Sequence, residues 1–521
     1  MEPLNASFER KIVTGLIVST EYITEIRRFW NIKLVQSSMA KRLCLWCIEY
    51  FDTYNKAPFK DIEGIFLEKL KTGKVPKDVA EEIEEEILPG LSDEYEREGK
   101  FNSEYLLAQT KRYFKERQLR LHTEQIQNLI DQGEITEAEN KALSFQVEQT
   151  EKIKVGLDLG TEEALYAVDK AFNQELQRVI TYPGPLGEMW NDQLVRGGFI
   201  GLLGPEKRGK TFRLMDMSIR AMNKKANVAF FQAGDMTEAQ QLKRICVYLA
   251  RKSDRERYCG KLFLPVKDCL WNQLDTCESA DRECDFGLFR VKEELQAGFR
   301  DSITFDMLKT AWEENQAEYK PCWNCKKNYK GSVWIKEIET GDPLTSKEAK
   351  EHLFSFFGKY KNRFKLSTHV NGTLTIQEMN TILQTWEKQD GFVPDVIVLD
   401  YADLLTTSKT QEFRHQQDYI WRSLRAMSQE KHCLVITATQ ADAKSYETNR
   451  LKLSNFSEDK RKYAHVTAMY GLNQDKLGRE KKLGLLRINE LVVREGDFDS
   501  KEEVYILQNL QTGRPFLGSF K

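Results

Sequence analysis

FIGLLGPEKRGKTFRLM spans residues 199 to 215, and this stretch decides the fold. FIGLLG is a short apolar run typical of a buried parallel strand, and the segment from Phe212 onward has helical character. Between them, Gly204 to Thr211 follow the pattern of Gly, four residues, Gly, Lys and Thr. Glycines let backbone N–H groups converge on phosphate oxygens, and the next helix adds its positive N-terminal end. The sequence therefore predicts a phosphate-binding loop.

We expect this loop to bind ATP together with Mg²⁺. Lys210 would reach the β- and γ-phosphates, and the Thr211 hydroxyl would bind the metal. A carboxylate at the end of a second apolar strand is also needed, and Asp400 fits because it ends VIVLD; the alternative is an ordinary aspartate at a turn. Asp403 is expected to be structural. The loop residues are Gly204, Pro205, Glu206, Lys207, Arg208, Gly209, Lys210 and Thr211.

Hydrolysis also requires a group that orients or deprotonates the attacking water. Asp235 directly follows the apolar run NVAFFQA and Gly234, and it is the candidate. The alternative is a helix N-cap before TEAQQLKRI. Gln440 ends another apolar run, where its side chain would sense the γ-phosphate or serve as an ordinary strand-end amide.

Short apolar runs alternate with helical segments through the second half of the chain. DVIVLDY at 395–401 and CLVITAT at 433–439 complete this set, which predicts an α/β fold with a mostly parallel sheet. Two further strands, LGLLRINELVVRE and KEEVYILQNL, are expected near the C-terminus. The expected organisation is an all-helical N-terminal domain at 1–150, a linker with a helix at 151–182, and an ATPase domain at 183–521.

The composition suits a globular protein of the cytoplasm. The formal net charge is −2, so any nucleic-acid surface must be a local patch. No apolar run approaches the roughly 18 residues of a membrane helix, and the start lacks the pattern of a secretion signal. We therefore expect no membrane partner.

The cysteines cluster in an expected insertion at 252–362 within the ATPase domain. CWNC places Cys322 and Cys325 at the Cys-x₂-Cys spacing that grips a tetrahedral metal. Two of Cys269, Cys277 and Cys284 would complete a structural Zn²⁺ site; the alternative is a set of unligated cysteines. Cys259 is a weaker candidate. The remaining cysteines are expected to pack in cores, and they are Cys44, Cys47, Cys246 and Cys433.

Taken together, these motifs resemble the DnaB-like replicative DNA helicases, a group of RecA-fold ATPases. The phosphate loop, GDM before a helix containing Arg244, DVIVLDYADLL and VITATQ occur in that family's order. The resemblance covers roughly residues 180 to 510 apart from the insertion, and more weakly the helical N-terminus. Within that family, the chain resembles a phage or mobile-element type with a cysteine-rich insertion. The resemblance implies a homo-oligomeric ring, hexameric in the family, that moves on single-stranded DNA with a loader or primase as a further partner.

Two departures from the family pattern concern catalysis. The family has Glu where this chain has Asp235, whose side chain is one methylene shorter. Where the family offers a Lys and an Arg to the neighbouring subunit, this chain has Gln508 and Leu510. Arg514 is the first candidate to replace them, with Arg487 and Arg494 as others.

Basic residues gather between Tyr446 and Lys482, which carry nine Lys or Arg against five Asp or Glu. They would contact DNA phosphates, or they would form a solvated loop. The candidates are Arg450, Lys452, Lys460, Arg461 and Lys462. Besides a ring helicase, the sequence allows a RecA-like ATPase that switches on DNA without unwinding, in recombination or defence, and a nucleotide-binding scaffold.

Overall fold

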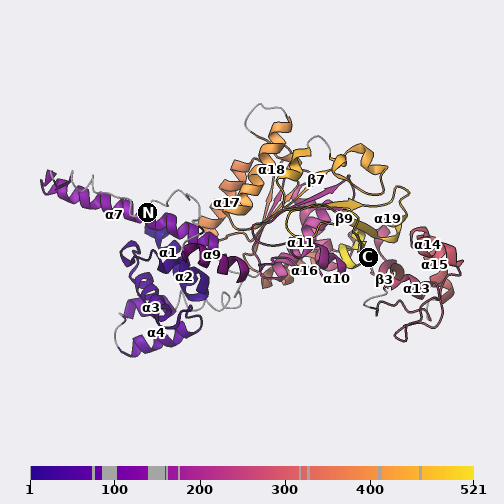
Figure 1. The fold of residues 1–521 in the computed structure, drawn as a ribbon, viewed down its shortest axis with the longest axis horizontal. Helices are drawn as coiled ribbons and strands as arrows, with labels where there is room; N and C mark the ends of the chain where they lie inside the picture. Colours follow the sequence, from indigo (N-terminus) through magenta and orange to yellow (C-terminus); the bar gives the residue numbers. More distant parts are fainter. Residues whose placement is uncertain are drawn as a thin grey trace. The chain divides into compact units, whose positions relative to one another are not determined.

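The computed structural model describes residues 2–72, 75, 77–84, 102–135, 137–138, 159, 162–173, 176–315, 318–325, 329–407, 413–456 and 460–521. The chain divides into two compact units, Met1–Gln177 and Arg178–Lys521. The domain boundary expected at residue 150 lies outside the described residues. Figure 1 shows helices in the first unit and a sheet covered by helices in the second.

The described part of Met1–Gln177 is helical. A buried apolar cluster holds its helices together, with Ile12, Leu16 and Ile17 on α1 and Leu43 on α3 among the residues without exposed surface. Helix starts follow local chemistry: the Ser19 side chain accepts from Tyr22 N at the start of α2. The elements are α1 (Glu2–Val18), α2 (Thr20–Arg27), η1 (Ile32–Leu34), α3 (Ser38–Tyr54), α4 (Asp61–Lys71), α5 (Lys77–Glu82), α7 (Ser103–Asp131) and α9 (Glu162–Asn173).

The second unit is built on a nine-stranded sheet in the order β11-β10-β9-β8-β1-β7-β6-β2-β5. The pairs from β8 through β1 to β5 are parallel, and the pairs from β8 to β11 are antiparallel. The four strands expected from the apolar runs are β1 (Phe199–Gly204), β2 (Val228–Gln232), β6 (Val396–Asp400) and β7 (Leu434–Gln440). The mostly parallel α/β sheet is therefore confirmed.

Several strands were not expected from the sequence. They are β5 (Phe364–Thr368), β8 (Ala468–Asn473) and β11 (Arg514–Phe520), whereas the expected C-terminal pair is β9 (Leu485–Val493) and β10 (Glu503–Asn509). β11 follows the short η9 (Leu510–Thr512), and its Pro515 and Gly518 weaken a strand pattern. It nevertheless pairs with β10 at the edge of the sheet.

Helices cover both faces of this sheet (Figure 1). One apolar cluster joins one face of the strands to α10 (Gly184–Trp190), α11 (Lys210–Asn223), α12 (Glu238–Ala250) and α16 (Ser346–Lys359). The other joins the opposite face to α17 (Ile376–Asp390) and α18 (Phe413–Glu430). Short 3-10 turns complete the connections: η5 (Ala402–Leu404), η6 (Ala443–Tyr446), η7 (Leu453–Asn455) and η8 (Lys460–Ala464).

The expected insertion contains a small two-stranded sheet of its own. β3 (Lys261–Cys269) and β4 (Gly331–Glu339) pair antiparallel, accompanied by η3 (Glu256–Tyr258), α13 (Leu270–Gln273), α14 (Glu293–Phe299), η4 (Arg300–Ser302) and α15 (Phe305–Asn315). Its apolar cluster includes Leu507 and Phe520 of the large sheet, as well as Leu483 of α19 (Arg479–Leu483). α16, which was expected inside the insertion, instead packs Phe356 and Phe357 against the main core.

Candidate functional site

The phosphate loop connects the buried strand β1 to the N-terminus of α11. Gly209 is the N-cap of α11 and has φ +80°, a left-handed conformation that favours glycine. A Cβ built at Gly209 would lie 3.0 Å from the Leu510 side chain, so the turn after β10 closes over the loop. Lys207 also has a positive φ, of +61°. The predicted turn, with helix N–H groups at one end, is present.

Lys210 is half-buried within this loop. Its Nζ donates to Gly204 O at 2.6 Å and to Pro205 O at 3.1 Å. Burial lowers the pKa of the ammonium group, and the negative charges of Asp403 and Asp400 oppose that shift. The lysine is therefore held at the loop by backbone carbonyl groups, in the field of Asp400 at the end of β6 and of Asp403 in the η5 turn that follows.

Asp400 ends β6 and is almost fully buried, with 1% of its surface exposed. Neither carboxylate oxygen accepts a well-formed hydrogen bond from any residue that the structure describes. Burial raises the pKa of this carboxyl to about 6, while the adjacent Thr211 hydroxyl lowers it. A buried carboxylate whose nearby donor is a single hydroxyl is an oxygen set that fits a hard cation such as Mg²⁺.

Asp235 is exposed shortly after the end of β2, and its charge acts on both Asp400 and Lys210. Its negative charge adds to the burial that raises the pKa of Asp400, and it opposes the burial that lowers the pKa of Lys210. The alternative role as N-cap of α12 belongs to Thr237, whose side chain accepts from Gln240 N in a capping box. Asp235 thus stands two residues before the helix cap and remains available for chemistry.

Gln440 ends β7, the strand between β1 and β6, and lies opposite Gly204 in register. Its Nε2 donates to Glu206 Oε1 at 3.0 Å, and its backbone N donates to Asp403 Oδ2 at 3.0 Å. Asp403 also accepts from Thr439 Oγ1 at 2.7 Å. Asp403 was expected to be structural, and these bonds show how it fixes the strand end beside the loop.

Arg208 connects the phosphate loop to the antiparallel half of the sheet, a link that the sequence did not suggest. Its Nη1 donates to Gln474 Oε1 at 2.8 Å, and Gln474 Nε2 donates to Leu485 O at 2.7 Å. Burial lowers the pKa of Arg208. Gln474 is a single glutamine after β8 and belongs to no motif, so the sequence could not have predicted its contact with Arg208.

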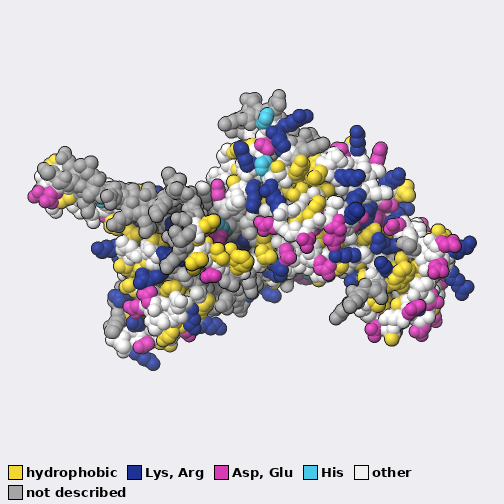
Figure 2. All heavy atoms as spheres, in the orientation of Figure 1, with side chains coloured by type: hydrophobic (Ala, Val, Ile, Leu, Met, Phe, Trp, Pro, Cys, Tyr) yellow, Lys and Arg dark blue, Asp and Glu magenta, His cyan; other side chains and the backbone are white. Residues whose placement is uncertain are grey.

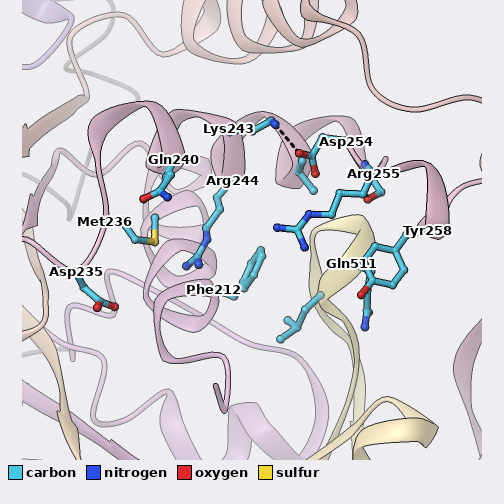
Figure 3. A pocket seen from close by; sticks show the side chains of 13 residues that line it. Phe212, Asp235, Met236, Gln240, Lys243, Arg244, Asp254, Arg255, Tyr258 and Gln511 are labelled. Atoms are coloured by element: carbon cyan, nitrogen blue, oxygen red, sulfur yellow. Dashed lines mark hydrogen bonds and ion pairs between the residues drawn. The ribbon is translucent and has the colours of Figure 1, made fainter. Parts of the chain in front are cut away.

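A pocket of about 500 Å³ opens beside the loop (Figure 3). Asp235 and Arg244 lie on one side, with the Arg244 guanidinium 5.3 Å from the Phe212 ring centroid. Burial lowers the pKa of Arg244, against the opposing charges of Asp400 and Asp235. The lining residues are Phe212, Asp235, Met236, Gln240, Lys243, Arg244, Val247, Ser253, Asp254, Arg255, Tyr258, Leu510 and Gln511.

Two solved structures resemble this chain. One, an ATPase domain, has a TM-score of 0.42 and 14% identity, covering 68% of this chain and 98% of that chain. The other, a DnaB-like replicative helicase studied for its interactions with primase, has a TM-score of 0.43 and 14% identity, covering 97% of this chain and 98% of that chain. Likeness at this level supports no argument about activity. No protein-family model and no curated protein matches the sequence.

The expected DNA-contacting residues have different surroundings. Lys462 is fully buried: its Nζ pairs with Asp403 Oδ1 at 2.8 Å and donates to Thr439 Oγ1 at 3.3 Å. It supports the strand end beside the phosphate loop, and its buried ammonium is not placed to meet a DNA phosphate.

The other basic candidates divide by exposure. Lys452 and Arg461 are exposed, whereas Arg450 is half-buried, donates to Glu502 O at 3.2 Å and lies 3.7 Å from the Glu503 carboxylate. The side chain of Lys460 lies outside the described residues. In Figure 2, basic side chains on the visible face of Arg178–Lys521 stand among acidic ones.

Gln508 and Leu510, which occupy the positions of the family's Lys and Arg, contact residues of their own chain. Gln508 is buried and accepts from Arg213 Nη2 at 3.3 Å, and Leu510 covers Gly209 of its own phosphate loop. Arg487 is buried and forms two ion pairs: its Nε lies 2.7 Å from Glu480 Oε1, and its Nη1 lies 3.2 Å from Glu503 Oε2. Arg494 is exposed and donates to Ala464 O.

Arg514 begins β11 beside Arg251. Its pKa is lowered by burial and by the positive charge of Arg251, and its Nη1 is a buried donor without a hydrogen-bond partner in the described chain. Its action on the nucleotide of a neighbouring subunit stays a prediction.

The expected zinc site is not supported. Among the described residues, no three or more His, Cys, Asp or Glu side chains are grouped so as to hold a metal ion. Cys269, Cys284 and Cys322 are buried, and Cys277 and Cys325 are partly exposed. The buried thiols meet the insertion's interior: Cys284 Sγ lies 3.9 Å from Glu318 O and Cys322 Sγ 3.9 Å from Asp281 O. These cysteines do not fit Zn²⁺ as placed.

The remaining cysteines agree with a packing role. Cys44 and Cys47 lie in the helical core, and burial raises the pKa of both thiols. Cys433 lies in the sheet core, and burial raises its pKa to about 12. Cys246 is half-buried on α12.

None of the described helices has the length and apolar composition needed to cross a bilayer.

Proposed function

We propose that this chain is an ATP-dependent replicative DNA helicase, a RecA-like motor that assembles as a ring and moves on single-stranded DNA. The observation that carries the nucleotide part is the buried Asp400 carboxylate, which has only the Thr211 hydroxyl beside it as a donor and Lys210 nearby. A carboxylate, a hydroxyl and an ammonium meeting at a glycine-rich turn and a helix N-terminus form a site for a magnesium-bound triphosphate.

Each residue then has a defined task. Loop N–H groups and Lys210 hold the phosphates, while Thr211 and Asp400 hold Mg²⁺, which would neutralise developing negative charge on the phosphate oxygens. Asp235 orients or deprotonates the attacking water. Gln440, tied to Glu206 at 3.0 Å, reports the state of the loop to β7.

The first test is hydrolysis. Lys210→Ala or Asp400→Asn should reduce single-stranded-DNA-stimulated ATP turnover by about 10²–10³-fold, because each removes a charge aimed at the phosphates or their metal. Lys388→Ala, on an exposed part of the last turn of α17, is the matched control and should leave turnover unchanged. Full turnover in both site variants would contradict a phosphate site at this loop.

The second test is unwinding. A forked duplex should be separated by the wild-type protein with ATP and not by Lys210→Ala. Turnover without strand separation would favour the DNA-dependent switch instead of the helicase.

A catalytically weak scaffold is the remaining alternative, and one observation favours it. Gln508 and Leu510 fold onto their own chain, where a Lys and an Arg would have served a neighbouring subunit. The scaffold predicts ATP binding without turnover, so calorimetric binding combined with a hydrolysis assay distinguishes it.

A further inference from the structure

The pocket beside the phosphate loop has a wall that belongs to the insertion. Phe212 comes from α11, Arg244 from α12 and Leu510 from the turn after β10, whereas Ser253 to Tyr258 lie where the chain leaves the core to form the insertion. Its volume of about 500 Å³ falls within the roughly 300–1,000 Å³ of small-ligand pockets.

The pocket continues the phosphate loop in a defined direction. Lys210 and Asp400 mark the end where terminal phosphates would lie, and Phe212 directly follows Thr211. A triphosphate cradled by the loop therefore directs its nucleoside toward Phe212 and Leu510. Leu510 is already in contact distance of Gly209, so this end of the pocket is continuous with the loop.

The insertion contributes a guanidinium group, from Arg255, and an aromatic ring, from Tyr258, to the end of the pocket near Phe212 and Leu510. Arg255 extends across the pocket toward Arg244 and Phe212, and Tyr258 stands beside Gln511 at the outer end (Figure 3). The charge of Arg255 contributes to lowering the pKa of Arg244, which places the two guanidinium groups in each other's field. A planar guanidinium facing a pocket lined by Phe212 and Tyr258 is suited to stacking on an aromatic base.

The wall contacts the core both where the chain leaves the core, at residues 252–254, and where it returns, at Leu344. Lys243 of α12 pairs with Asp254 at 2.7 Å, and Lys252 pairs with Glu348 of α16 at 2.8 Å. On the return passage, Leu344 N donates to Ser253 O at 2.7 Å. These contacts hold residues 252–255 in place, so the wall is positioned before a ligand arrives.

We propose that residues 253–258 of the insertion form the nucleoside end of the nucleotide site, with Arg255 stacking on the base and Tyr258 closing the outer end. This inference rests on the proposed ATP site at residues 204–211. It gives the insertion a role in substrate recognition.

The test compares two probes in the full-length protein by calorimetry with Mg²⁺: a non-hydrolysable ATP analogue and inorganic tripolyphosphate. Arg255→Gln should weaken binding of the analogue by about 10-fold, the size of a lost cation–π contact of one to two kcal/mol. Tripolyphosphate affinity should stay within about twofold, because it carries no base. Arg255→Lys keeps the charge but loses the planar face, and it should weaken analogue binding as well.

Arg290→Gln is the matched control, since Arg290 is an exposed arginine of the same insertion that does not line the pocket. It should leave both affinities unchanged. Equal loss of both probes in Arg255→Gln would place Arg255 at the phosphates and overturn the proposal, as would unchanged binding of both. Lys210→Ala separates the two ideas: it should lose tripolyphosphate and analogue alike, and retained binding of both would contradict the loop itself.

Discussion

Asp400 and Asp268 are two buried aspartates with the same shift and opposite surroundings. Burial raises the pKa of each carboxyl to about 6. Asp268, in the insertion, accepts hydrogen bonds from Tyr319 Oη at 2.6 Å and from the backbone N–H groups of Cys269 and Cys322 at 2.8 and 2.9 Å. Asp400 has no comparable donors among the described residues. The Asp268 carboxylate therefore stabilises the insertion, and the Asp400 carboxylate is the one that we propose to bind Mg²⁺.

Asp400→Asn should therefore stabilise the metal-free protein at pH 7.5 while reducing ATP turnover as stated above. The folded pKa of about 6 exceeds the ordinary value of 3.8, so the folded state binds a proton more tightly than the unfolded state. The free energy of unfolding of the wild type then falls as pH rises from about 4 to about 6 and stays low above it. Thermal melts in EDTA should show a gain of about 1–3 kcal/mol for the variant at pH 7.5, shrinking toward pH 4.5.

Asp268→Asn supplies the control at the same residue type. The raised pKa of Asp268 acts in the same direction as that of Asp400. The amide nitrogen of Asn, however, would face N–H and O–H donors that the carboxylate now satisfies, so the variant should show a net loss of about 1–3 kcal/mol at pH 7.5. If both variants changed stability in the same direction, the distinction between a satisfied and an unsatisfied buried carboxylate would not hold.

The pKa of Asp400 also predicts how turnover depends on pH. Only the ionised carboxylate holds Mg²⁺, and Asp400 becomes protonated as pH falls through about 6. The Mg²⁺ concentration for half-maximal ATPase rate should therefore rise as pH is lowered from 7.5 to 5.5, and excess Mg²⁺ should restore part of the rate. An unchanged Mg²⁺ requirement across this range would argue against Asp400 as the metal-holding group.

At the scale of elements, η8 carries two adjacent basic residues with different surroundings, the exposed Arg461 and the buried Lys462. Lys462 pairs with Asp403 beneath the end of β7, whereas Arg461 is exposed. Lys462→Met should destabilise the protein by about 3–5 kcal/mol, because it leaves the Asp403 charge without its buried partner. Chemical unfolding measures this loss.

Arg461→Gln should weaken binding to single-stranded DNA, because it removes an exposed positive charge. If Arg461 contacts one phosphate, the slope of log affinity against log salt concentration should decrease by about 0.7. Fluorescence anisotropy with a labelled oligonucleotide at several salt concentrations gives this slope. An unchanged slope would remove Arg461 from the proposed DNA surface.

The same elements show what the sequence could and could not predict. The buried strands β1, β2, β6 and β7 are continuous apolar runs, so they stand out without tertiary information. β5 has only half-buried residues, and β11 mixes buried and exposed positions around Pro515 and Gly518, so neither has a regular pattern.

Among site residues, Lys210, Thr211 and Asp400 follow from local motifs, and the structure brings them together. The roles of Lys462 and Arg255 depend on which distant segments meet them. Lys462 sits in a run of basic residues that resembles a solvated loop, and only folding shows that Asp403 and Thr439 surround it. Arg255 belongs to a segment whose neighbours on α11, α12 and η9 come from far apart in the sequence.

At the scale of the whole molecule, assembly depends on surfaces that one chain leaves exposed. α9 carries such a surface: Leu165, Val168 and Phe172 recur at three- and four-residue spacing and are 67%, 49% and 86% exposed. Apolar side chains on one helical stripe are costly to leave in water, and a second copy of the chain would cover them in the proposed ring.

Phe172→Asp should therefore shift the protein toward monomers, because it places a charge in an interface that excludes water. Sedimentation velocity with Mg²⁺ and a non-hydrolysable ATP analogue should show loss of the large species, whereas Asp169→Asn, also exposed on α9, should retain it. Each monomer still contains its own Lys210 and Asp400, so binding of the analogue should persist while DNA-stimulated turnover falls. A variant that keeps both the large species and its turnover would show that α9 does not join the subunits, and the ring would then require a different contact.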